Sequence, residues 1–187
     1  MKMVRFKSAR DFRTWLAKNH SESDGIWLRV YKKDSAVTSV TYPEALDQVL
    51  CYGWIDGQRK PYDPQSWLQK FTPRGPKSGW SKINTQHAER LTKSGEMAPA
   101  GMKAVGAAKA DGRWAAAYDS FSNATVPEDI LKELAKNRKA KAFFETLNKT
   151  NIYSITYRLQ TAKKPETRER RMKLILSMLA AGRKFHP

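Results

Sequence analysis

The stretch TYPEALDQVLCYGWIDGQ, residues 41–58, holds the two patterns that together decide the fold class. Thr41 and Glu44 have the spacing of a capping box, in which each side chain binds the other residue's backbone N–H at a helix start. Apolar residues then recur at helical spacing until a glycine, a residue that favours helix ends. We therefore expect a helix over 42–52, followed directly by an extended segment over 54–60.

Two other segments show strand signals. In IWLRVYKK, residues 26–33, apolar and polar side chains alternate with period two, as in a half-buried strand. The polar face of this strand carries two aromatic residues, Trp27 and Tyr31, which we expect to face a groove. A further segment over 66–72 follows PYDP, whose prolines and aspartate favour a turn. Together with 54–60 it predicts a hairpin.

These signals predict an α+β fold in which a small antiparallel sheet is covered by helices and followed by a helical C-terminal extension. The sheet is expected from residues 26–32, 54–60 and 66–72. Capping residues, apolar periodicity and flanking Pro or Gly predict the helices. Besides 42–52, they are expected over 9–20, 82–93, 99–110, 127–147 and 151–162, with a last one beginning at Pro165.

The boundaries between these elements predict two domains. FTPRGPKSGWS, residues 71–81, has too many prolines and glycines for regular structure and is expected to form a structured loop. SFSNAT, residues 120–125, is typical of a linker. We expect an α+β core domain over residues 1–120 and a helical module over residues 126–187 that packs on it.

Composition limits the classes of protein to which the chain can belong. A length of 187 residues, 40% of them hydrophobic and 6 of them Trp, suits a folded chain with one sizeable core. No apolar run suits a signal peptide or a membrane span, and a single cysteine excludes an internal disulfide framework. We expect a cytoplasmic protein. Its formal net charge of +17 favours polyanions or phosphorylated ligands as partners, although basic residues also serve general solubility.

One group of residues in the middle of the chain has the composition of a ligand-binding site. Aromatic rings, cations and hydrogen-bonding groups of this kind can hold a small anionic or sugar-like molecule. The group consists of Trp54, Asp56, Arg59, Arg74, Ser78, Trp80, Ser81 and Asn84. The same residues also suit a packed core with internal ion pairs and a helix cap. No acid, base and nucleophile converge in the sequence, so an enzyme acting on an unknown metabolite is a minor alternative.

A second candidate is a polyanion-binding surface near the C-terminus, where residues 126–187 contain 15 basic and 6 acidic residues. A nucleic acid or another acidic surface is the partner that such a surface would bind. The cations concerned are Lys163, Lys164, Arg168, Arg170, Arg171 and Lys173. An ordinary solvated helix face has the same composition, and no known nucleic-acid-binding motif accompanies these residues.

The remaining reactive residues predict no further chemistry. Cys51 lies at the C-terminal end of the 42–52 helix, where the helix dipole disfavours a thiolate, so we interpret it as a packing residue. His20, His87 and His186 are far apart in sequence and lack metal-ligand neighbours. We expect no metal and no cofactor.

Ordered blocks of sequence resemble the YdeI/OmpD-associated family. In the first part of the chain they are TYPEALDQVLCYGWIDGQ (41–58), FTPRGPKSGWSKIN (71–84), HAERL (87–91) and AKADGRW (108–114). In the last part, VPEDILKEL (126–134), KAFFETL (141–147) and TAKKPETRERRMKLILSML (161–179) resemble the short helical OmdA module of that family. The resemblance implies a bacterial stress-protection role, namely tolerance of bacteriocins or cationic antimicrobial peptides. It implies no agreed reaction, and its link to an outer-membrane porin does not suit a chain without an export signal.

Overall fold

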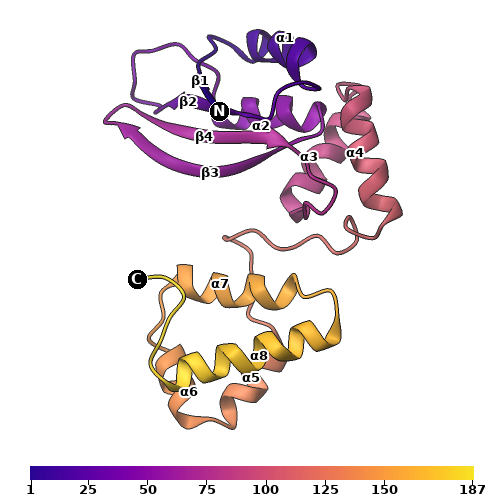
Figure 1. The fold of residues 1–187 in the computed structure, drawn as a ribbon. Helices are drawn as coiled ribbons and strands as arrows, with labels where there is room; N and C mark the ends of the chain where they lie inside the picture. Colours follow the sequence, from indigo (N-terminus) through magenta and orange to yellow (C-terminus); the bar gives the residue numbers. More distant parts are fainter. The chain divides into compact units, whose positions relative to one another are not determined.

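The computed structural model describes residues 1–187 and divides the chain into two compact units (Figure 1). The first unit comprises Met1–Trp80 and Asn84–Ala115, and the second comprises Ser81–Ile83 and Ala116–Pro187. Strands and helices combine in the first unit, and the four helices that follow residue 116 form the second. The predicted α+β fold class is confirmed.

Eight elements form the first part of the chain. The strands are β1 (Lys2–Val4), β2 (Ile26–Tyr31), β3 (Trp54–Asp63) and β4 (Ser66–Pro73). The helices are α1 (Ala9–Asn19), α2 (Tyr42–Cys51), α3 (Lys82–Lys93) and α4 (Pro99–Ala110). The capping box expected at the start of α2 is present, because Thr41 accepts from the Glu44 backbone and the Glu44 carboxylate accepts from the Thr41 backbone.

The four strands form one sheet in the order β1-β2-β4-β3. β4 pairs antiparallel with both β2 and β3, which agrees with the predicted sheet and hairpin. The expectation of a purely antiparallel sheet is corrected by β1, which pairs parallel with β2. A strand of three residues is too short to show alternation in the sequence, so β1 depends on its tertiary pairing.

The two faces of the sheet have different surroundings. We call the face that carries Ile26, Leu28 and Val30 the inner face, because these side chains are buried. Phe71 of β4 shares this face and contacts Phe12 of α1 at a ring separation of 6.2 Å. α1 and α2 lie on the same side of the sheet in Figure 1. The opposite face, which we call the outer face, carries the alternate residues of each strand.

The second unit contains α5 (Glu128–Ala135), α6 (Arg138–Phe144), α7 (Lys149–Gln160) and α8 (Pro165–Ala180). Its core consists of Ile130, Leu134, Ala140, Ile155, Leu159, Ile175 and Leu179. The prediction of a single helix over 127–147 is wrong, because the helix is interrupted between α5 and α6. Asn137 causes the break: its side-chain oxygen accepts from the Ala140 backbone N–H at 3.1 Å and so caps a new helix. No helix in the structure combines the length and apolar character that crossing a membrane requires.

Candidate functional site

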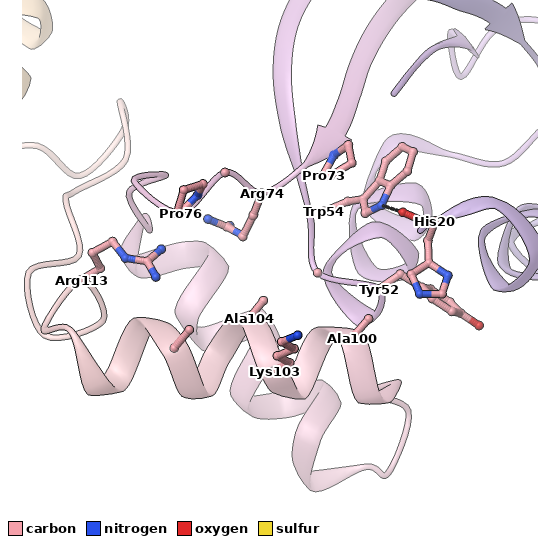
Figure 2. Close-up of a pocket in the computed structure, with 13 residues that line it drawn as sticks. His20, Tyr52, Trp54, Pro73, Arg74, Pro76, Ala100, Lys103, Ala104 and Arg113 are labelled. Carbon is pink, nitrogen blue, oxygen red and sulfur yellow. Dashed lines mark hydrogen bonds between the residues drawn. The ribbon is translucent and has the colours of Figure 1, made fainter. Parts of the chain in front are cut away.

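A hollow of about 320 Å³ lies in the first unit, where the end of α2, the ends of β3 and β4, and α4 meet (Figure 2). Aromatic side chains form one wall, α4 forms the floor, and cations line the other side. The lining residues that carry functional groups are His20, Tyr52, Trp54, Arg74, Lys103 and Arg113. The remainder are glycine, proline and alanine, so the hollow has no carboxylate in its lining.

Two glycines allow the floor to approach α2. Gly53, two residues after the end of α2, has a φ of +72°, and a side chain there would also meet the backbone carbonyl of Ala100. Gly101 is buried against the carbonyl group of Cys51, where a Cβ atom would clash with backbone atoms. The close contact between the α2 end and the first turn of α4 therefore requires glycine at both positions, and it places Lys103 beside the hollow.

Arg74 is held in place from two directions. Its Cζ atom lies 3.5 Å from the centroid of the Trp80 ring, and its Nη1 donates to the Gly79 carbonyl oxygen at 2.9 Å. Guanidinium groups stack on indole rings through a cation–π attraction. This stacking fixes a positive charge at the rim of the hollow (Figure 2).

Arg113 supplies a second fixed cation. The residue is only 7% exposed, and its Nε donates to the Asp111 carboxylate at 2.7 Å. Its Nη1 donates to the Ser78 carbonyl oxygen at 3.0 Å, which ties the segment after α4 to the loop after β4. Burial of a charge is unfavourable unless it is paired, and Asp111 provides that pairing.

The third cation and the aromatic wall complete the hollow. Lys103 is exposed on α4 and makes no ion pair in the structure. On the opposite side, the His20 ring lies 5.0 Å from the Tyr52 ring. His20 Nδ1 donates to the Leu16 carbonyl oxygen at 2.9 Å, so its Nε2 atom is the ring nitrogen left for another partner. Trp54 is 1% exposed and donates through Nε1 to the His20 carbonyl oxygen at 3.1 Å.

The structure brings only some of the predicted ligand-binding residues together at this hollow. Trp54 and Arg74 line it. Trp80 is buried under Arg74, and Ser78 supports the loop, because its hydroxyl accepts from the Gly75 backbone at 3.1 Å. Arg59 lies elsewhere, with its Cζ atom 4.3 Å from the Trp67 ring centroid.

Three other predicted residues also lie away from the hollow. Ser81 groups with the second unit, where it forms a β-bridge with Tyr118. Asp56 and Asn84 are hydrogen-bonded to each other at 3.2 Å, and the Tyr42 hydroxyl donates to Asp56 at 3.0 Å. Burial and the neighbouring Asp56 carboxylate raise the pKa of the Tyr42 hydroxyl well above its usual range. Asp56 therefore bonds to Tyr42 and Asn84 instead of forming the internal ion pair of the core interpretation, and Asn84 lies within α3 rather than capping it.

Sequence reasoning missed four residues of the hollow: His20, Tyr52, Lys103 and Arg113. Arg113 lies in the AKADGRW block, so its position in a family-like motif was a signal that could have indicated it. Nothing in the local sequence distinguishes Lys103 from other exposed lysines, because its role depends on the long-range contact of α4 with α2.

The predicted polyanion-binding cations divide into two groups. Arg168 pairs with Asp129 at 2.7 Å, Arg171 donates to the Arg158 carbonyl oxygen at 2.6 Å, and Lys173 pairs with Glu169. These three contacts lie within the second unit. Lys163, Lys164 and Arg170 are exposed. Half of the predicted cations thus contribute to the helical packing or to local ion pairs.

Cys51 is buried, and its burial raises the pKa of the thiol. We expect the dipole at the end of α2 to disfavour the thiolate, and burial in the structure acts in the same direction. A neutral, inaccessible thiol is a poor nucleophile, which agrees with the interpretation of Cys51 as a packing residue.

Two family models match the chain. Residues 4–104 match a family described as Domain of unknown function (DUF8412), and residues 123–182 match the family described as Bacteriocin-protection, YdeI or OmpD-Associated (OmdA). No curated protein and no solved structure is detectably similar to the chain. The resemblance to the OmdA module is confirmed for the C-terminal part, whereas the blocks between residues 41 and 91 fall within the other family and the block over 108–114 lies outside both matches. The chain belongs to the DUF8412 family of domains of unknown function, and residues 123–182 in its helical C-terminal unit match the OmdA family model.

Proposed function

We propose that the protein is a noncatalytic stress-protection protein whose first unit binds a small anion in the hollow of Figure 2. The observation that carries the proposal is the charge of the lining: Arg74 and Lys103 contribute cations, Arg113 adds a guanidinium whose charge is paired with Asp111, and no lining residue is acidic. A hollow of about 320 Å³ lies at the small end of the range typical of ligand sites. It suits a compact ligand with a phosphate or carboxylate group.

The arrangement of the cations favours binding at a modest entropic cost. Arg74 and Arg113 are already held by stacking and hydrogen bonds, so little side-chain freedom is lost when an anion arrives. The planar fork of a guanidinium group also matches two oxygen atoms of a carboxylate or phosphate group. Lys103, which is exposed and flexible, can adjust its single charged group to the ligand that is present.

The same geometry favours an anionic ligand over a neutral sugar. Sugar recognition commonly uses an aromatic plate with an open face, but Trp54 is 1% exposed and its N–H is already bonded to His20. The aromatic wall is therefore mainly structural. Charge is the property that the hollow offers to a ligand.

Protection against cationic peptides would then be indirect. The family description of the C-terminal module supports a role in bacteriocin protection. A chain with a formal net charge of +17 repels cationic peptides at long range, so direct capture of the peptide is opposed by electrostatics. A protein that senses or sequesters an anionic metabolite avoids this conflict.

Thermal unfolding of the full chain with two matched probes tests the ligand class. Glucose 6-phosphate should raise the unfolding temperature, whereas glucose at the same concentration should not. A ligand at 100 times its Kd stabilises a protein by about 2.7 kcal/mol. Lys103→Gln should weaken the affinity about fivefold, as expected for about 1 kcal/mol from an exposed charge, and so give a smaller rise in unfolding temperature, whereas Lys93→Gln on α3 should respond like wild type. Equal stabilisation by both probes, or equal responses of the two variants, would contradict the proposal.

The protective role has a separate test in cells that lack the gene. Wild-type protein and Lys93→Gln should restore survival after exposure to a cationic antimicrobial peptide, whereas Lys103→Gln should restore it incompletely. Full rescue by Lys103→Gln would show that protection does not depend on anion binding in the hollow. Immunoblots of the three strains keep the comparison at equal protein levels.

A further inference from the structure

The outer face of the sheet carries a second arrangement of cations and aromatic rings, which is independent of the hollow. On β2, Trp27 and Tyr31 alternate with Arg29 and are partly exposed, while the residues between them are buried on the inner face. Lys70 of β4 is the register partner of Trp27 and shares its face. Tyr62 of β3 is 47% exposed.

The rings and cations of this face are interleaved. The Lys60 Nζ atom lies 4.3 Å from the centroid of the Trp27 ring. Arg29 has its Cζ atom 4.6 Å from the Tyr31 ring centroid and 4.9 Å from that of Tyr62. Hydrogen bonds from Arg29 to Ser66 at 3.0 Å and to Asp63 at 2.6 Å fix its position between the two tyrosines. The face therefore presents alternating π surfaces and positive charges on three neighbouring strands.

We propose that this outer face is a binding platform for single-stranded nucleic acid. Sheets that bind single strands combine aromatic side chains, on which bases stack, with cations that contact the phosphates. Trp27, Tyr31 and Tyr62 supply the rings, and Lys60 and Lys70 supply charges beside them. Arg29 supplies a guanidinium plane, which also stacks on bases. Both parts of a nucleotide thus find a complementary group on the same face.

The arrangement favours this occupant over other partners. Lysine is depleted at protein–protein interfaces, whereas Lys60 and Lys70 both lie beside Trp27 on this face. Duplex recognition commonly inserts a helix or a two-stranded ribbon into a groove, and a sheet face with partly exposed rings suits unpaired bases better. The formal net charge of +17 adds long-range attraction for a polyanion.

Fluorescence anisotropy with labelled oligo(U) and oligo(dT) tests the platform on the full chain. Probes of about 10 nucleotides fall within the usual site size of a single-strand-binding domain. Affinity should fall steeply as salt rises, and Lys60→Gln should reduce the slope of log K against log salt by about one. Tyr62→Ala should weaken binding about fivefold or more, whereas Tyr62→Phe, which keeps the ring, should bind like wild type. Comparing the affinities for the RNA and DNA probes shows which type of nucleic acid the platform prefers.

Two control variants locate the effect. Lys93→Gln on α3 and Arg170→Gln on α8 remove the same charge from exposed sites elsewhere, and each should change the affinity less than about twofold. Circular dichroism of every variant confirms folding, and Tyr62 is exposed enough that its replacement should leave the fold intact.

Four results would overturn the platform. The first two are no binding at low salt and unchanged binding by Tyr62→Ala. The third is polyphosphate that displaces the labelled probe as well as an unlabelled oligonucleotide does at the same charge concentration. The fourth is a loss of affinity in Arg170→Gln instead of in the variants of the outer face. If the wild-type chain is a dimer, and Tyr62→Ala dissociates it without changing oligonucleotide binding, the outer face binds a second copy of the chain instead.

Discussion

The guanidinium of Arg74 rests on the indole ring of Trp80, with Cζ 3.5 Å from the ring centroid. The ring is buried and lies outside the lining of the hollow, so it supports a cation rather than contacting a ligand. This relationship explains why a tryptophan and an arginine six residues apart belong to one site although only Arg74 lines it. It also makes the position of the charge dependent on a planar cation.

Replacing Arg74 with lysine should preserve the charge and still weaken anion binding. Lysine cannot reproduce the stacked geometry or the planar fork that fixes the guanidinium. We expect about a fivefold loss of affinity for glucose 6-phosphate by isothermal titration calorimetry, equivalent to about 1 kcal/mol. Arg74→Ala, which removes the charge as well, should lose more. Wild-type affinity in Arg74→Lys would show that charge alone is sufficient at this position.

The contact between α2 and α4 predicts unequal effects of two glycine substitutions on the same helix. Gly101→Ala places a Cβ atom against the Cys51 carbonyl and should lower the free energy of unfolding by about 1–3 kcal/mol. Gly106→Ala meets no atom within 4 Å and should stabilise α4 by roughly 0.5–1 kcal/mol through helix propensity. Urea unfolding of the two variants checks both signs. Similar values for both would mean that the close contact does not form.

Asn151 joins the C-terminal tail to α7. Its buried side-chain oxygen accepts from the Phe185 and His186 backbone N–H groups at 3.1 and 3.0 Å. Asn151→Ala leaves these donors without their acceptor and should destabilise the second unit by about 1–3 kcal/mol. Hydrogen exchange should show faster exchange at both amides. Unchanged exchange there would mean that the tail has another anchor.

The pH dependence of stability should include a contribution from Asp119. A hydrogen bond from Lys82, with a second from Gln160, lowers the pKa of the Asp119 carboxyl below its usual value despite the opposing effect of burial. Because the folded pKa is depressed, this stabilisation is present above the unfolded value of about 3.9 and is lost as the pH falls through the folded pKa. Asp119→Asn should therefore unfold at a lower temperature at pH 7 and lose less stability on acidification. Parallel thermal profiles of the two proteins from pH 7 to acid would contradict this.

Local sequence signals were sufficient for most elements of the fold. The capping box at Thr41 predicts where α2 begins, and the alternation from Ile26 predicts β2. Both predictions succeed because capping and side-chain period are properties of a few neighbouring residues. β1 was missed because three residues carry no period, and its pairing with β2 is a tertiary effect. The break at Asn137 was missed because the apolar positions continue across it.

The candidate site was less predictable for a physical reason. Trp54 and Arg74 belong to a recognisable central motif and do line the hollow, but Asp56 lies away from it, where it accepts from Tyr42 and Asn84. Lys103 joins the site only because Gly101 lets α4 approach α2, and no short pattern encodes that approach. Residue types indicated the kind of chemistry, whereas long-range packing decided which residues provide it.

The most direct test of the central claim is a nuclear magnetic resonance titration of the full chain with inorganic phosphate, followed at the arginine Nε–H signals. We expect the signals of Arg74 and Arg113, and the backbone amides of Gly53, Gly75 and Lys103, to shift together along one saturable curve. Sodium chloride at matched ionic strength should not reproduce the curve. Shifts that are absent from these groups, or that scatter over exposed lysines and arginines with no saturation, would contradict an anion site in this hollow.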